Sequence, residues 1–198
     1  MRYNEVIELE VVTDLATEPV TLAEQKAHMN MFFETSGAYD FTDDNNYITN
    51  LIITARQLLE KYTGLSFGTK TLRAILRNEC GGQEIPAGPN IVVTSVKDID
   101  GNTYAVYTSN TSGHTYRLSG NQYKSFISPF LCYLDVSYTA GYGAGKLPYP
   151  LKQAIMMQVQ FMYDNRGSQQ QNYAAANVDL CKSALELAAP YKKTSFLV

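Results

Sequence analysis

The sequence predicts an α+β fold in which a small bundle of about four helices carries an inserted, mostly antiparallel β unit and an N-terminal strand or arm. Two observations lead to this prediction. Residues 43–64 repeat apolar residues at three- and four-residue intervals, as an amphipathic helix does. After Gly64 the period changes to two, and it becomes helical again near residue 150. We therefore expect four parts: an arm at 1–20, a helical core at 21–65 and 147–190, a β insertion at 66–146, and a tail at 191–198.

The first expected elements are a strand and a capped helix. Residues 5–12 alternate as a strand does, which places Val6, Leu9 and Val11 on one face. Thr21 and Glu24 have the spacing of a capping box, in which the threonine oxygen accepts from a first-turn amide and the glutamate reaches back. We expect the helix that they begin to run to about residue 33. Its apolar side would consist of Leu22, Met29 and Phe33.

The next helix, at residues 43–64, has the clearest pattern in the chain. Asp43 and Asp44 suit its start, because negative charge is favourable near the N-terminal end of a helix dipole, and Gly64 suits its end. Its apolar face is formed by Tyr47, Ile48, Leu51, Ile52, Ala55, Leu58, Leu59 and Tyr62. Ile53 lies away from this face, and two interpretations stay open. It is either a lone exposed isoleucine or part of a contact surface for a neighbouring subunit.

Residues 66–140 have the alternation and the turn residues of a β unit. Thr69–Arg77 alternates Leu72, Ala74 and Leu76 with more polar residues. Residues 91–99 form a β-rich run, and Asp100-Gly101 predicts a hairpin turn that pairs this run with residues 103–107. Residues 114–118 and 131–138 are two further expected strands, and residues 109–113 have turn composition.

The glycine-rich segment 141–145 predicts a flexible hinge that leads from the sheet to a third helix at residues 151–163. That helix is apolar around most of its circumference, so we expect it to be buried on more than one side. Its large apolar residues are Leu151, Ile155, Met156, Met157, Phe161, Met162 and Tyr163. A last amphipathic helix is expected at residues 178–189, ended by Pro190.

The sequence contains no recognisable arrangement of catalytic residues. The segment 140–147 departs from a phosphate-binding loop, because Leu147 and Pro148 stand where a hydroxyl residue and a helix are needed. Only two histidines are present, and the three cysteines are widely separated. The sequence therefore shows neither the ligand spacing of a zinc site nor the cysteine pattern of a disulfide framework. We therefore expect no catalytic, cofactor-binding or metal-binding residues and no cofactor.

The bulk properties restrict the partners. A formal charge of −3 argues against a dedicated nucleic-acid binder but is compatible with DNA passing nearby. No apolar run approaches the ~20 residues that span a bilayer, and the N-terminal residues lack a signal-peptide core. We expect no membrane partner. The 15 tyrosines favour interfaces, where the ring is buried and the hydroxyl stays hydrated.

Four segments, in order, resemble a known family. They are residues 20–28 (VTLAEQKAH), 55–67 (ARQLLEKYTGLSF), 136–143 (VSYTAGYG), and 147–155 (LPYPLKQAI) with 161–167 (FMYDNRG) beyond. Together they are similar to the head–tail connector, or adaptor, proteins of tailed bacteriophages, also described as putative DNA-packaging proteins. The resemblance covers roughly residues 18–190. The strand at 5–12 and the long β insertion depart from the family pattern.

The resemblance implies a structural, non-enzymatic subunit of the virion neck, made in the host cytoplasm. Family members form a ring, commonly of twelve copies, beneath the portal protein. The ring continues the channel through which DNA passes without sequence-specific binding, and it is a platform for tail or stopper proteins. The alternative left open is a β-rich module of a phage particle that binds protein or glycan. An enzyme is disfavoured by the shortage of catalytic residues.

A ring subunit needs two different lateral faces, one for each neighbour. The apolar third helix, Ile53 and the apolar tail are the expected sources of these faces and of a portal contact. The interface candidates are Ile53, Met156, Met157, Phe161, Tyr163, Tyr191, Phe196, Leu197 and Val198.

Overall fold

The chain divides into two units, and each is described here by itself. A computed structural model describes residues 6–31, 44–78, 83–98, 101, 103, 106–110, 116–120, 132–166 and 180–193. The sheet unit comprises residues 1–16 and 64–146, and the helical unit comprises residues 17–63 and 147–198. The α+β class, with helices, an antiparallel sheet and an N-terminal strand, is confirmed.

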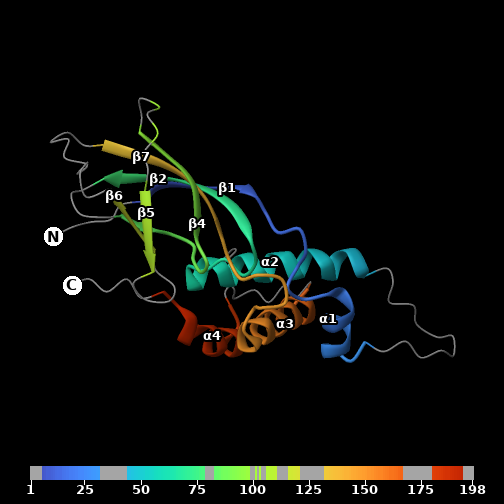
Figure 1. The fold of residues 1–198 in the computed structure, drawn as a ribbon. Coiled ribbons are helices and arrows are strands. Elements are labelled where there is room, and N and C mark those ends of the chain that lie inside the picture. Colours follow the sequence, from blue (N-terminus) through green and yellow to red (C-terminus); the bar gives the residue numbers. More distant parts are fainter. Residues whose placement is uncertain are drawn as a thin grey trace. The chain divides into compact units, whose positions relative to one another are not determined.

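Helix α3 is the centre of the helical unit. The unit contains α1 (Leu22–His28), α2 (Asn45–Thr63), α3 (Tyr149–Asp164), α4 (Lys182–Ala188) and the 3₁₀ turn η1 (Ala189–Tyr191). The α3 helix packs against α1, α2 and α4, as Figure 1 shows for α2 and α4 on either side of it. Its buried residues are Leu151, Ala154, Ile155, Gln158 and Val159. These positions recur at three- and four-residue intervals and share one face of the helix, so full burial is confined to that face. The apolar residues on the other sides are half-buried or exposed, and the expectation that α3 is buried on more than one side is not confirmed.

The start of α1 agrees with the prediction, and its end and its buried face do not. Both hydrogen bonds of the capping box are present: the Glu24 amide donates to Thr21 Oγ1 at 3.2 Å, and the Thr21 amide donates to Glu24 Oε2 at 2.9 Å. The helix ends at His28 rather than at residue 33, because Asn30 adopts a left-handed conformation with φ 54°. Its buried residues are the polar Gln25 and Lys26 instead of the expected apolar side. Phe33 lies outside the described residues.

The α2 helix follows its sequence pattern closely. Ile48, Ile52, Ala55 and Leu59 are buried on the predicted face, and Gly64 follows the helix with φ 71°. The left-handed backbone there is one that glycine adopts without strain. The buried face also contains Arg56, which the apolar pattern did not include.

All strand pairs of the sheet unit are antiparallel. One sheet has four strands in the order β1-β2-β7-β4, formed by Val6–Thr13, Lys70–Asn78, Cys132–Ala140 and Val92–Asp98. A second sheet has the order β3-β6-β5, formed by Gln83–Ile85, Tyr116–Gly120 and Val106–Asn110. The core of the unit lies on one face of the larger sheet, where the alternation of Leu72, Ala74 and Leu76 is confirmed as buried.

Residues 91–99 and 103–107 form only one residue pair, so the predicted hairpin is wrong. Lys97 and Thr103 form an isolated bridge, but the strand that follows, β5, pairs with β6 in the second sheet. Ser109 and Asn110, expected in a turn, are the last residues of β5. A local turn pattern fixes the reversal of the chain, whereas the partner of the next strand depends on non-local packing.

Two predicted features near the C-terminal half also need correction. Gly141, the first residue of the segment 141–145 expected to be a flexible hinge, is tightly packed: its amide donates to the Pro89 carbonyl at 2.7 Å, and a Cβ atom there would lie 1.9 Å from the Gly68 carbonyl oxygen. A hinge at residues 142–145 stays a prediction. Pro190 does not stop the last helix directly. The α-helix ends at Ala188, and Pro190 lies within η1, where its fixed φ suits a first turn.

Candidate subunit-interaction surfaces

The apolar surface of α3 is only partly buried inside the helical unit. Of the predicted interface residues on this helix, Met156, Met157 and Tyr163 are half-buried, and only Phe161 is exposed, at 44%. Polar contacts join α3 to its neighbours as well. Gln25 of α1 donates from Nε2 to the Met156 carbonyl at 3.2 Å, and the Cys181 amide at the start of α4 donates to Gln158 Oε1 at 2.8 Å. The packing of α1, α2 and α4 therefore buries one face of α3 and leaves the apolar residues on its other sides half-buried or exposed.

The other predicted interface residues are distributed as follows. Ile53 of α2 is half-buried, so it is not the fully exposed residue that its position off the apolar face suggests. Tyr191 is half-buried within η1. Phe196, Leu197 and Val198 lie outside the described residues. The structure brings Met156, Met157, Phe161 and Tyr163 onto one helix but does not join them to Ile53 in one described cluster.

Tyr163 belongs to a polar cluster that ties the start of α2 to the end of α3. Its hydroxyl donates to Asp44 Oδ2 at 2.5 Å, and Arg166 Nη1 lies 2.9 Å from the same oxygen. The Arg166 guanidinium also lies 4.1 Å from the centre of the Tyr163 ring and 5.8 Å from that of Tyr47. The expected role of Asp44 was to favour the start of its own helix. Its carboxylate instead reaches across to the end of α3.

The electrostatics of this cluster follow from its contacts. The hydrogen bond from Tyr163, followed by that from Arg166, lowers the pKa of Asp44 below its ordinary value. Burial raises the pKa of Tyr163, and its hydrogen bond to the Asp44 carboxylate raises it further. At neutral pH the cluster therefore contains a carboxylate, a neutral phenol and a guanidinium, which suits it to hold two helix ends together.

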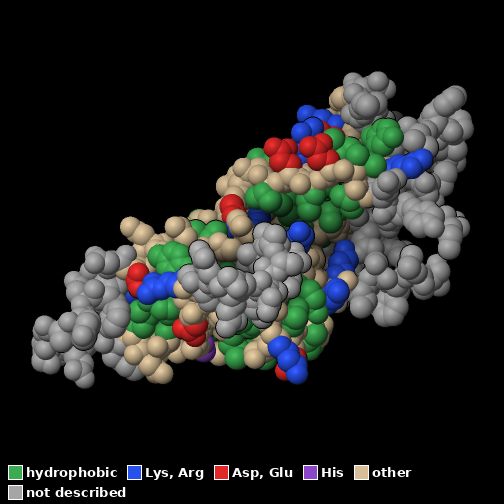
Figure 2. Space-filling view, turned by 180° about the vertical axis from the view of Figure 1, so that it is seen from behind, with side chains coloured by type: hydrophobic (Ala, Val, Ile, Leu, Met, Phe, Trp, Pro, Cys, Tyr) green, Lys and Arg blue, Asp and Glu red, His purple; other side chains and the backbone are tan. Residues whose placement is uncertain are grey.

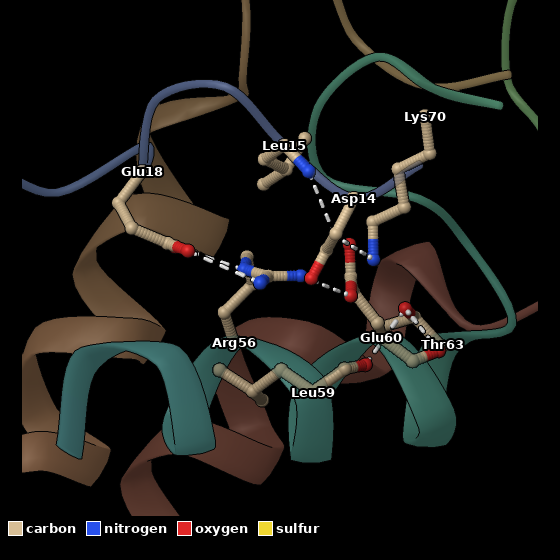
Figure 3. A network of polar contacts seen from close by, with 8 residues as sticks. All are labelled: Asp14, Leu15, Glu18, Arg56, Leu59, Glu60, Thr63 and Lys70. Atoms are coloured by element: carbon tan, nitrogen blue, oxygen red, sulfur yellow. Dashed lines mark hydrogen bonds and ion pairs between the residues drawn. The ribbon is translucent and has the colours of Figure 1, made fainter. Parts of the chain in front are cut away.

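A second polar network is buried within the helical unit. Arg56 is 1% exposed, and its guanidinium donates to Glu18 from Nε at 2.8 Å and from Nη2 at 3.1 Å. Its Nη1 donates to Glu60, one turn further along α2, at 2.9 Å. Figure 3 shows the two carboxylates approaching the guanidinium from different sides. Because a buried charge needs partners, this network fixes the segment before α1 against α2.

Figure 3 also shows the ion pair between Asp14 and Lys70, which belongs to the sheet unit. The Lys70 Nζ atom lies 3.1 Å from Asp14 Oδ1, and the Leu15 amide donates to the same oxygen at 2.9 Å. Lys70 begins β2, and Asp14 directly follows β1. The pair therefore fastens one end of β1 to the neighbouring strand.

The C-terminal tail begins at a fixed point. The Lys193 amide donates to the Thr63 carbonyl at 2.8 Å, and the Lys192 ammonium lies 4.8 Å from the centre of the Tyr62 ring. Both contacts are with the last turn of α2. The two lysines therefore attach the start of the tail to the end of α2.

Within the described residues, one strand is exposed and apolar along its length, and this was not recognised from the sequence. Five residues of β1 are between 40% and 56% exposed: Val6, Ile7, Leu9, Val11 and Val12. The alternation had correctly placed Val6, Leu9 and Val11 on one face, opposite Leu76, Ala74 and Leu72 of β2. It gave no signal that this face of the edge strand would stay uncovered. Tyr149, at 86% exposed, was also missed, because the prolines on either side of it resemble a loop.

The described residues contain no candidate metal site. Within them, no group of three or more His, Cys, Asp and Glu side chains is placed to hold a metal ion. Cys181 is a free thiol. No described helix has the length and apolar character needed to cross a bilayer.

The comparison with protein families decides the assignment. The family described as "Head completion protein" matches residues 28–181, which is most of the chain. This chain belongs to the head completion protein family. The resemblance to phage head–tail connector proteins, which rested on four short segments, is confirmed at the level of the family.

Solved structures agree with this assignment. This chain resembles a chain in the neck of an empty gene transfer agent (GTA) particle computed with C6 symmetry, with a TM-score of 0.75 and 16% identity. It also resembles chains in the virion of a native GTA particle (TM-score 0.66, 17% identity) and in the neck of a native GTA particle computed with C12 symmetry (TM-score 0.65, 16% identity). Each match covers 96% of this chain and 98% of the other.

At this level of identity, the matches establish that the fold is shared. The search of curated proteins found no match.

Proposed function

We propose that this head completion protein is a structural subunit of a virion neck, where copies form a ring beneath the portal protein. The observation that carries the proposal is the agreement between the family match and the shared fold, since the similar structures are in particle necks computed with C6 and C12 symmetry. The ring continues the DNA channel, contacts tail or stopper proteins on its other side, and contains twelve copies of the chain.

The charge and chemistry of the chain support this role. A net charge of −3 suits a channel wall that DNA passes without being held. The polar networks of the helical unit pair Arg56 with Glu18 and Glu60, and Asp44 with Tyr163 and Arg166, so these charged groups hold elements together. We propose a non-enzymatic protein without a cofactor, located in the virion neck after synthesis in the host cytoplasm.

The expected four-part division is kept as a proposal, with one change. The β1 strand, Val6–Thr13, pairs with β2 of the β insertion, so we assign the N-terminal strand to the sheet unit. The helical unit then provides contacts through Ile53, Phe161, Met156, Met157 and Tyr163. The tail, which starts beside Thr63 at Lys193, docks on the portal or on an adjacent subunit.

The proposal is tested by mixing the purified full chain with portal-bearing capsids that lack neck proteins and imaging them in negative stain. A ring at the portal vertex, with a copy number that native mass spectrometry confirms, is the expected result. A chain that stays monomeric at high concentration, leaves the portal vertex bare and binds an isolated glycan or protein would instead support the β-rich binding module.

A further inference from the structure

The β1 strand is an apolar edge of the four-stranded sheet. It is the first strand in the order β1-β2-β7-β4, and among the described strands only β2 pairs with it. An edge strand presents unpaired backbone N–H and C=O groups, which are ready to pair with another extended segment. Five apolar side chains along β1 are each 40–56% exposed: Val6, Ile7, Leu9, Val11 and Val12. A row of this length is one that proteins normally cover.

Both charged residues of β1 are acidic. Glu8 is exposed and forms no ion pair with another described residue. The Glu10 side chain is 54% exposed, and its Oε2 atom lies 3.5 Å from Arg73 Nη1. The edge is therefore both apolar and negative. A segment that matches it carries apolar side chains together with positive charge.

The C-terminal segment of the chain has this chemistry. Residues 192–198 read KKTSFLV, two lysines followed by a stretch that ends in three apolar residues. The segment starts at a fixed point, because the Lys193 amide donates to the Thr63 carbonyl at 2.8 Å. The side chain of Lys192 is exposed beside the Tyr62 ring. From there residues 194–198 can extend by at most about 17 Å, the length of a short strand.

One parallel register matches the two segments position by position. Opposite charges meet at one end, a hydroxyl faces a carboxylate, and two apolar pairs follow. The pairs are Lys193 with Glu8, Ser195 with Glu10, Phe196 with Val11 and Leu197 with Val12. An antiparallel pairing that keeps Phe196 beside Val11 would bring the C-terminal carboxylate close to Glu8. Charge therefore favours the parallel direction.

We infer that residues 194–198 of one subunit add as a strand to the β1 edge of a neighbouring copy of this chain. The inference rests on the proposed ring, and it assigns the tail to the adjacent subunit rather than to the portal. Each subunit of a ring has one tail and one β1 edge, so passing every tail to the next subunit leaves no edge open. The short reach of the tail restricts the acceptor to a subunit in direct contact.

Crosslinking identifies the acceptor of the tail. Full-length chains that carry the photoreactive residue p-benzoylphenylalanine in place of Phe196 are assembled with isotopically labelled chains that lack it, and are then irradiated. We expect the unlabelled tail to be crosslinked to the labelled peptide that contains Val11. Crosslinks confined to β1 of the same chain, to the portal or to another surface would overturn the inference.

Paired substitutions test the contact independently. Phe196→Asp and Val11→Asp each place a charge in the same apolar contact, so each should raise the concentration for half-maximal ring assembly by about tenfold or more. The double variant should assemble no worse than either single variant, because both remove one junction. Val92→Asp, the same change at a 63% exposed position on β4, is the matched control and should assemble normally.

Assembly is measured by mass photometry across a concentration series, with and without portal-bearing capsids, and folding is checked by the thermal unfolding midpoint. If the unaltered chain forms rings and folded Phe196→Asp and Val11→Asp assemble at the same concentration, the tail does not complete β1 and the ring stands. If the unaltered chain forms no ring even on capsids, the proposed function falls, and this inference with it.

Discussion

Arg56 of α2 donates two hydrogen bonds to the carboxylate of Glu18, a residue 38 positions earlier that lies before the first helix. The Arg56 side chain is 1% exposed and the Glu18 side chain 23% exposed. If the ion pair were broken, water could therefore hydrate the two charged groups only in small part. The ion pair makes the segment before α1 part of the packed helical unit.

Replacing Arg56 with methionine should lower the free energy of unfolding by about 3 kcal/mol or more, because Glu18 and Glu60 would keep partly buried charges without their partner. Urea titration followed by circular dichroism measures the loss. The control is Lys182→Met, which removes an exposed pair with Glu186 at 3.9 Å and should change stability by less than about 0.5 kcal/mol. Equal stability of the two variants would contradict a structural role for Arg56.

The cluster at Asp44 predicts a pH dependence in acid. The pKa of Asp44 is lowered in the folded chain, so its ion pairs stabilise the fold above the ordinary carboxylate pKa of about 4. This stability is lost as the pH falls through the lower folded pKa. The thermal midpoint should therefore fall less between pH 6 and pH 2.5 in Asp44→Asn than in the unaltered chain. Asp164→Asn, at an exposed site in α3, should leave the slope unchanged.

Gly141 should not tolerate a side chain. Its φ of 122° is unfavourable for other residues, and an added Cβ atom would meet the Gly68 backbone at 1.9 Å. We expect Gly141→Ala to destabilise the sheet unit by at least about 2 kcal/mol. Gly143→Ala is the control, since its nearest atom would be Lys146 Cδ at 4.0 Å. A Gly141→Ala chain with an unchanged melting temperature would show that the backbone there can move.

Local signals predicted some elements well, and non-local contacts explain the failures. The capping box at Thr21 and the glycine after α2 act within a few residues, so the sequence pattern contains them completely. The end of α1 depended on a left-handed Asn30, and its buried face contains Gln25, which donates to a carbonyl 131 residues away. A repeat of apolar residues in the sequence gives no indication of a hydrogen bond from a buried polar side chain to a distant helix. The partner of β5 was missed for the same reason.

Only part of the candidate interface could be predicted from the sequence. The pattern of α3 showed that it is apolar all round, but this pattern cannot separate burial by other helices of the chain from burial by another subunit. The structure buries one face of α3 against its neighbouring helices and leaves Met156, Met157, Met162 and Tyr163 half-buried. Figure 2 shows that exposed hydrophobic side chains still gather in several patches on one face, beside acidic and basic ones.

Ile53→Asp should impair ring formation while the monomer stays folded, because Ile53 is half-buried on α2 outside the apolar face. Ring content is measured by mass photometry, and folding by circular dichroism. Asn50→Asp, at an exposed position of the same helix, is the control. Normal assembly of a folded Ile53→Asp chain would make Ile53 an ordinary surface isoleucine.

Removal of residues 194–198 should weaken attachment to portal-bearing capsids without lowering stability, since the contacts of Lys192 and Lys193 with α2 are retained. Cosedimentation with capsids measures attachment. Removal of 191–198 should weaken attachment equally but also lower the melting temperature, because those contacts are lost. Unchanged cosedimentation of both truncated chains would exclude the tail as a docking element.

Thr63 is the last residue of the helical unit before the chain crosses into the sheet unit, and its carbonyl accepts the Lys193 amide. Lys192 also lies over the Tyr62 ring, and the backbone before it leads through η1 to α4. A pull on the residues after Lys193 would therefore load the last turn of α2 as well as α4, beside the residue at which the polypeptide leaves the helical unit.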